Sequence, residues 1–319
     1  MYIVKTSNGY AFSESEENAV VFVNSPIVEE NGEDVLFEKC EDGYKSLGFS
    51  CTEKVNDEGR GLFSVERTLT NVGYTTRIVK FVFETVTAFK PARYIIPSVS
   101  YDGNKQGGGL EPKGMLHENG KPWIHSYDRT PVPSCSVTEN KETAFSLFAD
   151  AMTPESQVSA VSLRPVGDEI SQRIYWPQTE APFTYYDNDV YNEPLHKYLT
   201  LKSGESHTVK VYMLLSAPKW ENFGVCDTLD RALELFPFTH GKNRTVDDIW
   251  RLGIAYSRYL YRIVGGKKLF ADGCSERHPQ GIIGYSMHTD IGWLGHNIMN
   301  ARMHILEYLR TGDKQTLDD

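Results

Sequence analysis

A short segment near the end of the chain gathers side chains that could hold a polar ligand. Residues 284–297 read GYSMHTDIGWLGHN, with two histidines, an aspartate, an asparagine, a tyrosine and a tryptophan among three glycines. The rings of Trp293 and Tyr285 are suited to stacking. The side chains suited to hydrogen bonding are those of His288, Asp290, His296 and Asn297. The segment is therefore a candidate binding site.

The same residues also suit an ordinary helix entry. Trp293 would then pack in a core, Asp290 or Thr289 would cap the helix, and His296 would lie at the surface. Both interpretations stay open from the sequence.

A glycine-rich loop is the second candidate site. Residues 101–115 read YDGNKQGGGLEPKGM, and Gly107–Gly109 allow the backbone to approach a ligand closely. Tyr101, Asp102 and Asn104 would then face that ligand. Because the loop does not join a strand to a helix at phosphate-loop spacing, a nucleotide site is not indicated. A surface hairpin without a ligand is the alternative.

An acidic stretch raises the question of a metal. Residues 185–193 read YYDNDVYNE, with acidic side chains at Asp187, Asp189 and Glu193. Oxygen ligands at this spacing suit calcium, but the stretch lacks the glycine and the full ligand set of a known calcium loop. A solvated acidic turn is favoured, and neither a metal nor a cofactor is predicted.

Composition and charge narrow the class of protein. The chain has 319 residues and a formal net charge of −10, and this length favours two domains. No run of lysine and arginine could neutralise a phosphate backbone, so a nucleic-acid partner is not expected. No apolar stretch approaches the roughly 20 residues of a membrane span, and the N-terminus lacks a signal peptide. Five unpaired cysteines suit a reducing compartment, so a cytoplasmic location is expected.

Up to about residue 218 the apolar residues recur with a period of two. Residues 61–89, GLFSVERTLTNVGYTTRIVKFVFETVTAF, are the best example, with a turn at Asn71–Gly73. Ser203–Glu205 is interpreted as a hairpin turn between two strands. About a dozen such strands predict two large packed antiparallel sheets.

After Pro218 the spacing becomes that of helices. We expect a short helix that opens at Asp227–Asp230, a second from Thr245 to Gly265–Gly266, a third from near Trp293 to Gly312, and a fourth capped by Asp313. The residues predicted to face inward are Ile249, Leu252, Tyr256, Leu260 and Val264 on the second helix and Leu294, Ile298, Ala301, Ile305 and Leu309 on the third. So few helices cannot close a helical domain, and the chain is therefore expected to be truncated.

This order of elements, and two local segments, resemble a known architecture. The segments are IGWLGHNIMNARMHILEYLRTGD at 291–313 and PSVSYDGN at 97–104. They are similar to glucoamylase-like glycoside hydrolases and to the maltose and chitobiose phosphorylases, in which a β-supersandwich precedes an (α/α)6 barrel. The resemblance implies an α+β multidomain fold: an antiparallel β-supersandwich at 1–218, a helical linker at 219–244, and the first helices of an (α/α)6-barrel catalytic domain at 245–319.

The resemblance also implies a carbohydrate-active enzyme, in the first place a glycoside hydrolase that inverts at the anomeric carbon. Sugars stack their apolar faces on aromatic rings, while carboxylates, amides and imidazoles pair with their hydroxyl groups. The substrate-binding residues would be Tyr101, Asp102, Asn104, His288, Asp290, Trp293, His296 and Asn297.

Glycoside cleavage generally needs two carboxyl groups. In the resembled families these groups lie later in the barrel than Asp319, so Asp290 is the one candidate catalytic residue in this chain. A glycoside phosphorylase and a non-catalytic carbohydrate-binding or assembly module are the alternatives. The expected partner is a small-molecule saccharide, and a homo-oligomer is allowed.

Overall fold

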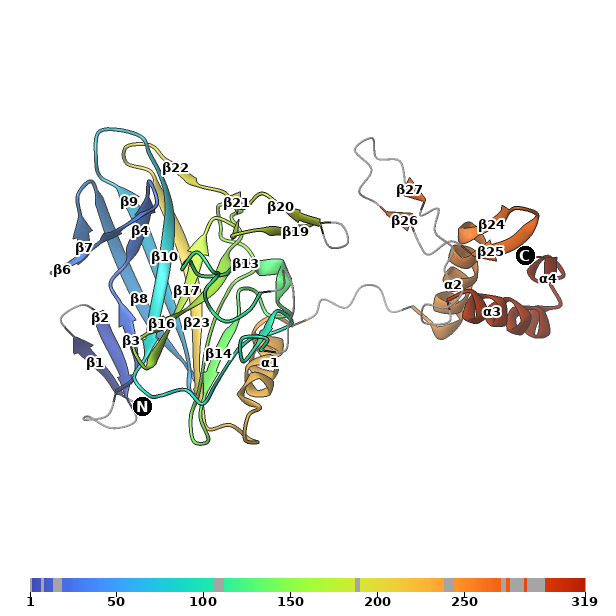
Figure 1. The fold of residues 1–319 in the computed structure, drawn as a ribbon, viewed down its shortest axis with the longest axis horizontal. Helices are drawn as coiled ribbons and strands as arrows, with labels where there is room; N and C mark the ends of the chain where they lie inside the picture. Colours follow the sequence, from blue (N-terminus) through green and yellow to red (C-terminus); the bar gives the residue numbers. More distant parts are fainter. Residues whose placement is uncertain are drawn as a thin grey trace. The chain divides into compact units, whose positions relative to one another are not determined.

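The chain divides into two compact units, Met1–Pro237 and Phe238–Asp319, which are described separately below. The computed structural model describes residues 2–6, 9–13, 19–105, 112–186, 190–237, 244–270, 274–275, 284–285 and 296–318. Figure 1 shows the strands of the first unit and the helices of the second.

The first unit is built on two large antiparallel sheets. The first sheet contains, in spatial order, β1 (Tyr2–Thr6), β2 (Gly9–Ser13), β3 (Ala19–Asn24), β10 (Arg77–Thr87), β17 (Glu169–Trp176), β16 (Ala160–Val166) and β13 (Ile124–Ser126); β4 (Ile27–Glu30) and β22 (Leu199–Leu201) also pair with β10, and β5 (Glu33–Leu36) pairs with β4. The second contains β12 (Ser100–Tyr101), β11 (Arg93–Ile96), β14 (Ser136–Glu139), β15 (Ala144–Ala149), β23 (Ser206–Ser216), β9 (Leu62–Asn71), β8 (Phe49–Gly59), β7 (Gly43–Ser46) and β6 (Glu38–Cys40). The prediction of two large antiparallel sheets is confirmed.

An apolar core fills the space between the sheets. On β10 the alternate residues Val79, Phe81 and Phe83 turn into it, because successive side chains of a strand point to opposite faces. From the second sheet Phe63 of β9 enters the same core, where its ring lies 4.6 Å from that of Phe12 on β2. Each buried phenylalanine contributes about 1.5–3 kcal/mol, so the period-two pattern accounts for the packing of the two sheets.

Arg67 of β9 is a charged exception inside this core. Its side chain is fully buried, and its Nε donates to Glu53 Oε2 at 2.7 Å. Its Nη2 donates to the Asn24 carbonyl oxygen at 2.6 Å, and its guanidinium lies 4.4 Å from the centre of the Phe83 ring. Because Asn24 belongs to β3, Arg67 ties the second sheet to the first.

The turn at 202–205 does not close a hairpin. Glu205 N donates to the Lys202 carbonyl oxygen, as a turn requires, but β22 pairs with β10 in the first sheet and β23 pairs with β9 and β15 in the second. The prediction of a hairpin at Ser203–Glu205 is therefore wrong. The sequence supplies the turn, whereas pairing with distant strands decides which sheet each arm joins.

Small elements complete the first unit. They are β18 (Thr179–Glu180) paired with β21 (Leu195–His196), β19 (Thr184–Tyr186) paired with β20 (Val190–Asn192), a 3-10 turn at Tyr127–Arg129, and the helix α1 (Gly224–Leu235). Ala232 of α1 packs with Tyr212 and Leu214 of β23, and Thr228 shares a 2.6 Å hydrogen bond with Ser146 of β15. The helix therefore covers the second sheet on the side away from the core.

Gly224→Ala is expected to lower the free energy of unfolding of the first unit by about 1–3 kcal/mol, because overpacking forces neighbours apart. A Cβ at this position would lie 2.5 Å from the Ala144 Cβ and 2.8 Å from Glu139 Oε2, which accepts a 2.7 Å hydrogen bond from the Gly224 amide. Urea unfolding measures the change. The control is Gly253→Ala in the second unit, where the Cβ meets only the flexible end of Met303 and helix propensity favours alanine by about 1 kcal/mol. Equal effects of the two substitutions would contradict this account.

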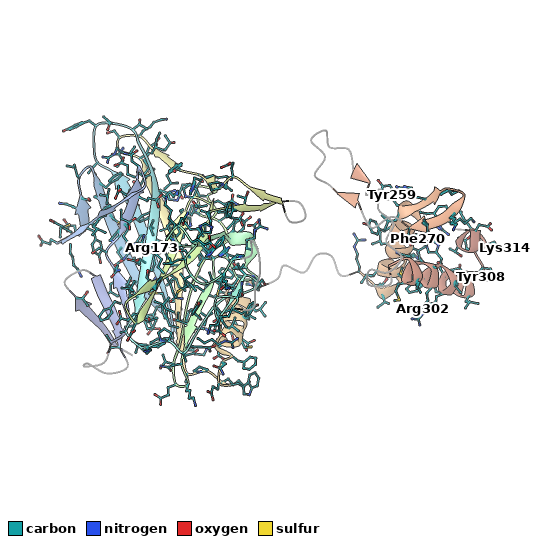
Figure 2. All side chains as sticks on the ribbon, viewed as in Figure 1. Arg173, Tyr259, Phe270, Arg302, Tyr308 and Lys314 are labelled. Carbon is teal, nitrogen blue, oxygen red and sulfur yellow. The ribbon has the colours of Figure 1, made fainter. Side chains whose placement is uncertain are left out.

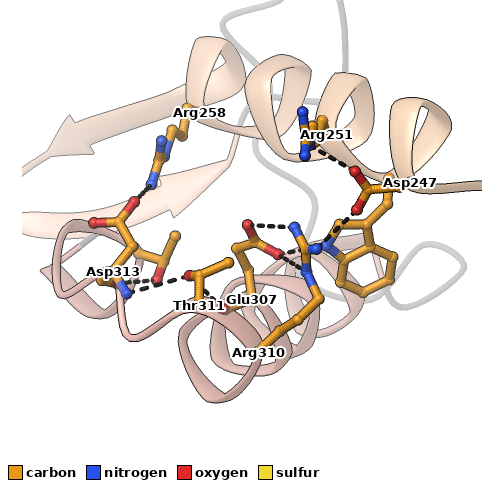
Figure 3. Close-up of polar contacts among 9 residues, drawn as sticks. Asp247, Arg251, Arg258, Glu307, Arg310, Thr311 and Asp313 are labelled. Atoms are coloured by element: carbon orange, nitrogen blue, oxygen red, sulfur yellow. Dashed lines mark hydrogen bonds and ion pairs between the residues drawn. The ribbon is translucent and has the colours of Figure 1, made fainter.

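The second unit contains the helices α2 (Val246–Leu260), α3 (His296–Thr311) and α4 (Gln315–Asp318). The predicted capping box of α2 is confirmed, because Thr245 Oγ1 accepts from Asp248 N and Asp248 Oδ2 accepts from Thr245 N. Polar side chains join the helices: Trp250 Nε1 donates to Glu307 Oε2 at 2.6 Å (Figure 3). Arg258 pairs with Asp313 at 2.7 Å, which holds the start of α4 against α2 (Figure 3).

The predicted end of α2 is wrong. The helix stops at Leu260, and residues Tyr261–Val264 form β24, which pairs with β25 (Lys267–Phe270). Gly265 and Gly266 have φ angles of 58° and 75° and make the two-residue turn between them. Two glycines in this conformation fit a hairpin, and the β-branched residues ahead of them favour a strand. Two further short strands, β26 (Cys274–Ser275) and β27 (Gly284–Tyr285), also pair.

The predicted inward faces of the helices are largely exposed. Ile249 on α2 and Ile298 and Leu309 on α3 are each at least 60% exposed, whereas Leu260 is buried as predicted. The buried residues of α2 include Ile254 and Ser257 instead. Apolar residues occur on more than one side of these helices, so helical spacing alone did not identify the packed side. Val264 and Leu294 lie outside the described side chains, and the (α/α)6 barrel stays a prediction.

Candidate functional site

The outer face of the first sheet, opposite the core, carries buried charged residues. On β10 it holds Lys80 and Glu84, and on β17 it holds Arg173, which pairs across the ladder with Glu84. The exposed fractions of Lys80, Glu84 and Arg173 are 1%, 8% and 7%. Removing a charge from water costs several kcal/mol unless a partner compensates it. Such a cluster on one sheet face is therefore a candidate functional site.

A cover built from loops encloses this face. Ile124 of β13 exchanges backbone hydrogen bonds with Ala181, at 2.9 and 3.0 Å. Arg129 pairs with Glu180 through two bonds of 2.8 and 3.1 Å, which fixes residues 180–181 further. Beneath the cover a small apolar floor of Val82, Tyr175 and Ile124 packs on the sheet. The cover is thus rigidly attached to the sheet.

A cavity of about 790 Å³ opens beside this floor, and we refer to it as the Lys80 cleft. Its lining includes Lys80 and Arg173 from the sheet, the β4–β5 hairpin, and His196 and Tyr198 from the cover. This volume falls within the range of roughly 300–1,000 Å³ that small-molecule sites occupy.

Lys80 is the centre of a polar group inside the cleft. Its Nζ lies 2.9 Å from Glu29 Oε1 and 3.1 Å from His196 Nδ1. The same Nζ lies 5.0 Å from the centre of the Tyr198 ring, within range of a cation–π interaction. A single ammonium group thereby fixes a carboxylate, an imidazole and an aromatic ring.

His196 is held in its neutral form. Partial burial of the ring lowers the pKa of His196 below its ordinary value, and the positive charge of Lys80 lowers it further. Because an ammonium has no lone pair, the hydrogen bond makes Nδ1 the acceptor and assigns the ring proton to Nε2. At neutral pH the imidazole therefore offers one N–H donor.

Arg173 belongs to the first unit (Figure 2) and anchors the β4–β5 hairpin that lines the cleft. Its Nε donates to Glu84 Oε1 at 2.6 Å, and its Nη2 lies 2.8 Å from Asp34 Oδ2 on β5. Burial by itself would raise the pKa of Glu84, but Arg173 and hydrogen bonds from Ser171 and Asn24 hold it below its ordinary value. Glu84 is therefore ionised and keeps Arg173 in place.

The arrangement is suited to a neutral polar ligand. Two cation–carboxylate pairs, Lys80 with Glu29 and Arg173 with Asp34, hold their groups in place before a ligand arrives, and Glu33, Lys121 and Arg164 also line the cleft. Such groups leave donors and acceptors in set positions for hydroxyl groups, and the Tyr198 ring, 45% exposed, offers an apolar surface. Within the described residues no group of three or more histidine, cysteine or acidic side chains could hold a metal ion.

Three of the residues predicted for a site lie elsewhere in the first unit. Asp102 pairs with Arg93 at 3.0 Å, and Asn104 accepts from the Tyr101 amide at 3.0 Å. The Tyr101 hydroxyl accepts from Ser98 N at 2.9 Å. These bonds fold the turn after β12 at the edge of the second sheet, and none of the three residues lines the Lys80 cleft.

The other predicted residues belong to the second unit. His288, Asp290 and Trp293 lie outside the described residues. His296 and Asn297 are the first two residues of α3, and nothing further is described of their side chains. The suggested calcium ligands Asp187 and Asp189 also lie outside the described residues.

Lys80, Glu29, Arg173 and His196 were not among the predicted site residues. One signal was present in RIVKFVFETVT, where Lys80 and Glu84 interrupt a run of apolar residues. Alternation indicated that both belong to the outer face, but not that loops far along the chain bury that face. No comparable signal marks His196.

Comparisons with known proteins give no family. No family of known proteins matches the chain, and no curated protein matches it. Among the described residues no helix combines the length and apolar character that crossing a bilayer requires.

Several solved structures are similar over part of the chain. A galactose mutarotase-like protein from Lactobacillus casei ATCC 334 is 10% identical, with 68% of this chain and 100% of that chain covered and a TM-score of 0.33. A human-microbiome protein proposed to be a kojibiose phosphorylase is 9% identical, with 68% and 26% covered and a TM-score of 0.30. A TPR-domain containing protein from Parabacteroides distasonis ATCC 8503 is 10% identical, with 78% and 44% covered and a TM-score of 0.34. These TM-scores lie below 0.5, so the fold described above rests on the strand pairing of this chain.

Proposed function

We propose that the first unit binds a saccharide in the Lys80 cleft, as the ligand-binding part of a carbohydrate-active enzyme. The observation that carries the proposal is the group around Lys80, in which a buried ammonium fixes Glu29, neutral His196 and the Tyr198 ring at the wall of a cavity. Saccharides present hydroxyl groups around an apolar ring face, and this set of groups complements both.

The charges of the cleft suit binding better than proton transfer. A general acid for glycoside cleavage needs a carboxyl group with a raised pKa. Glu29 and Asp34 are instead each held in an ion pair, with Lys80 at 2.9 Å and with Arg173 at 2.8 Å. We therefore assign these two residues to ligand binding and place the acid and base of any hydrolysis outside the cleft.

Glycoside hydrolysis remains the proposed reaction, with an (α/α)6 barrel beginning at residue 245 as its proposed scaffold. Support for a separate helical part comes from the second unit, whose helices carry apolar residues on their exposed sides. A glycoside phosphorylase and a non-catalytic binding module are the alternatives. Product release from aryl glycosides in water indicates a hydrolase, release that requires inorganic phosphate indicates a phosphorylase, and binding without release indicates a module.

Tyr198→Ala is expected to weaken saccharide binding by about tenfold or more, because an aromatic contact contributes roughly 0.5–1.5 kcal/mol beyond the apolar area it buries. Isothermal titration calorimetry against a panel of mono- and oligosaccharides, with wild type and variant side by side, measures the change.

Trp220→Ala is the matched control for Tyr198→Ala. Its ring is 58% exposed, and it does not line the Lys80 cleft. Near-UV circular dichroism establishes that both variants keep the folded sheets. An affinity that stays the same in Tyr198→Ala, or falls equally in Trp220→Ala, would remove the cleft as the binding site.

A further inference from the structure

A second cavity adjoins the Lys80 cleft. Its volume is about 410 Å³, and it is lined by Thr200 of β22, by Ser206 and His207 at the start of β23, and by Glu155 and Gln157. Tyr198 lines both cavities. The Tyr198 ring, which faces Lys80, therefore lies at the boundary between the two cavities.

The second cavity has its own polar wall. His207 is 2% exposed, and its Nδ1 lies 3.4 Å from Glu155 Oε2. Within the described part of the chain, His207 Nε2 is buried without a hydrogen-bond partner. Glu155 Oε1 also accepts a long hydrogen bond of 3.4 Å from the Thr208 amide, which fixes the carboxylate beside β23. A buried nitrogen without a partner is unfavourable, and a ligand hydroxyl that reaches it would remove that cost.

The strands that line the second cavity come from different sheets. Thr200 belongs to the first sheet through β22, and His207 belongs to the second through β23. The turn at 202–205 that links them has Glu205 Oε2 accepting from the Lys202 amide at 2.8 Å. The cavity therefore lies where the chain crosses between the sheets, and Tyr198 from the cover of the Lys80 cleft completes its lining.

We propose that the ligand is an oligosaccharide that extends from the Lys80 cleft across the Tyr198 ring into the second cavity. This inference rests on the proposed saccharide binding and adds the length of the ligand to it. One sugar residue would pair with the group around Lys80, and a following residue would meet hydroxyl, amide and carboxylate groups from Thr200, Gln157 and Glu155. Tyr198, 45% exposed, supplies the apolar surface where the chain passes from one cavity to the other.

The test is affinity as a function of ligand length. Malto- and cello-oligosaccharides of one to four residues are titrated into the unmodified chain by calorimetry. In the series that binds, affinity is expected to rise at least tenfold between the monosaccharide and the trisaccharide. Thr200→Tyr, at an exposed strand position that tolerates an aromatic residue, fills the second cavity and is expected to return the trisaccharide affinity to that of the monosaccharide.

Thr52→Tyr is the matched control, because Thr52 is exposed on β8 and lines neither cavity. Gln157→Tyr fills the cavity from another segment and replaces the first variant if Thr200→Tyr does not fold. Two results would overturn this inference and leave the proposed function standing. One is a monosaccharide that binds the unmodified chain as tightly as the trisaccharide. The other is a cavity-filling variant that still binds the trisaccharide more tightly than the monosaccharide. Absence of binding to every saccharide of the panel overturns both.

Discussion

Replacing Lys80 with methionine is expected to lower the free energy of unfolding of the first unit by about 3 kcal/mol and to abolish saccharide binding. Methionine keeps much of the apolar stem but leaves Glu29, 19% exposed at its side chain, without its cation, and unpaired buried charges cost about 3–5 kcal/mol. The loss of binding follows because His196 and Tyr198 lose the group that fixes them. Urea unfolding and calorimetry measure the two effects.

Two further variants separate charge from packing at Lys80. In Lys80→Met/Glu29→Gln no carboxylate is left unpaired, so the double variant should be more stable than Lys80→Met alone. Lys45→Met, on the exposed side of β7, is the surface control and should change stability by less than about 0.5 kcal/mol. Wild-type stability together with wild-type affinity in Lys80→Met would rule out the role assigned to this lysine.

Arg67→Met is expected to be the most destabilising substitution in the first unit, with a loss of about 4 kcal/mol. The arginine is fully buried, and its removal leaves Glu53 without its cation, with a 3.2 Å hydrogen bond from the Tyr44 hydroxyl, and takes a donor away from the Asn24 carbonyl. Because the Asn24 amide also donates to Glu84 at 2.7 Å, the disturbance reaches Arg173 and the cleft. We therefore expect weaker saccharide binding as well as a lower urea midpoint.

Arg60→Met is the comparison for Arg67→Met. Arg60 pairs with Glu234 at the surface, where both side chains are about half or more exposed, so its loss should cost no more than about 1 kcal/mol. If the two arginines proved equally dispensable, the interpretation of Arg67 as the link between the sheets would have to be abandoned.

The β architecture could be predicted because alternation is a local property. In residues 61–89 each strand carries its own pattern, and β9 and β10 follow it closely. Partner choice is not local. The sequence around Ser203–Glu205 contains a turn, but the pairing of β22 with β10 and of β23 with β9 depends on strands more than 100 residues away. The predicted helix end at Gly265–Gly266 is wrong for a related reason, since two glycines suit both a helix end and a hairpin.

The cleft could not be predicted because three distant parts of the chain form it. Glu29, Lys80 and His196 come from β4, β10 and β21, and no short motif joins them. The predicted Tyr101, Asp102 and Asn104 do have the polar and aromatic character expected of a site. Their side chains instead complete hydrogen bonds of their own turn, a use of such residues that a sequence cannot distinguish from ligand binding.

The pairing of β9 with β23 has a consequence for how the protein is made. Thr68 and Thr208 face each other across that ladder, 140 residues apart in the chain. At about 5–20 residues per second on a ribosome, this separation corresponds to roughly 7–28 s. During this interval the β8–β9 hairpin has emerged with one edge unoccupied. A nascent chain of this protein should therefore depend on holding chaperones, and slower elongation should increase the fraction that aggregates before release.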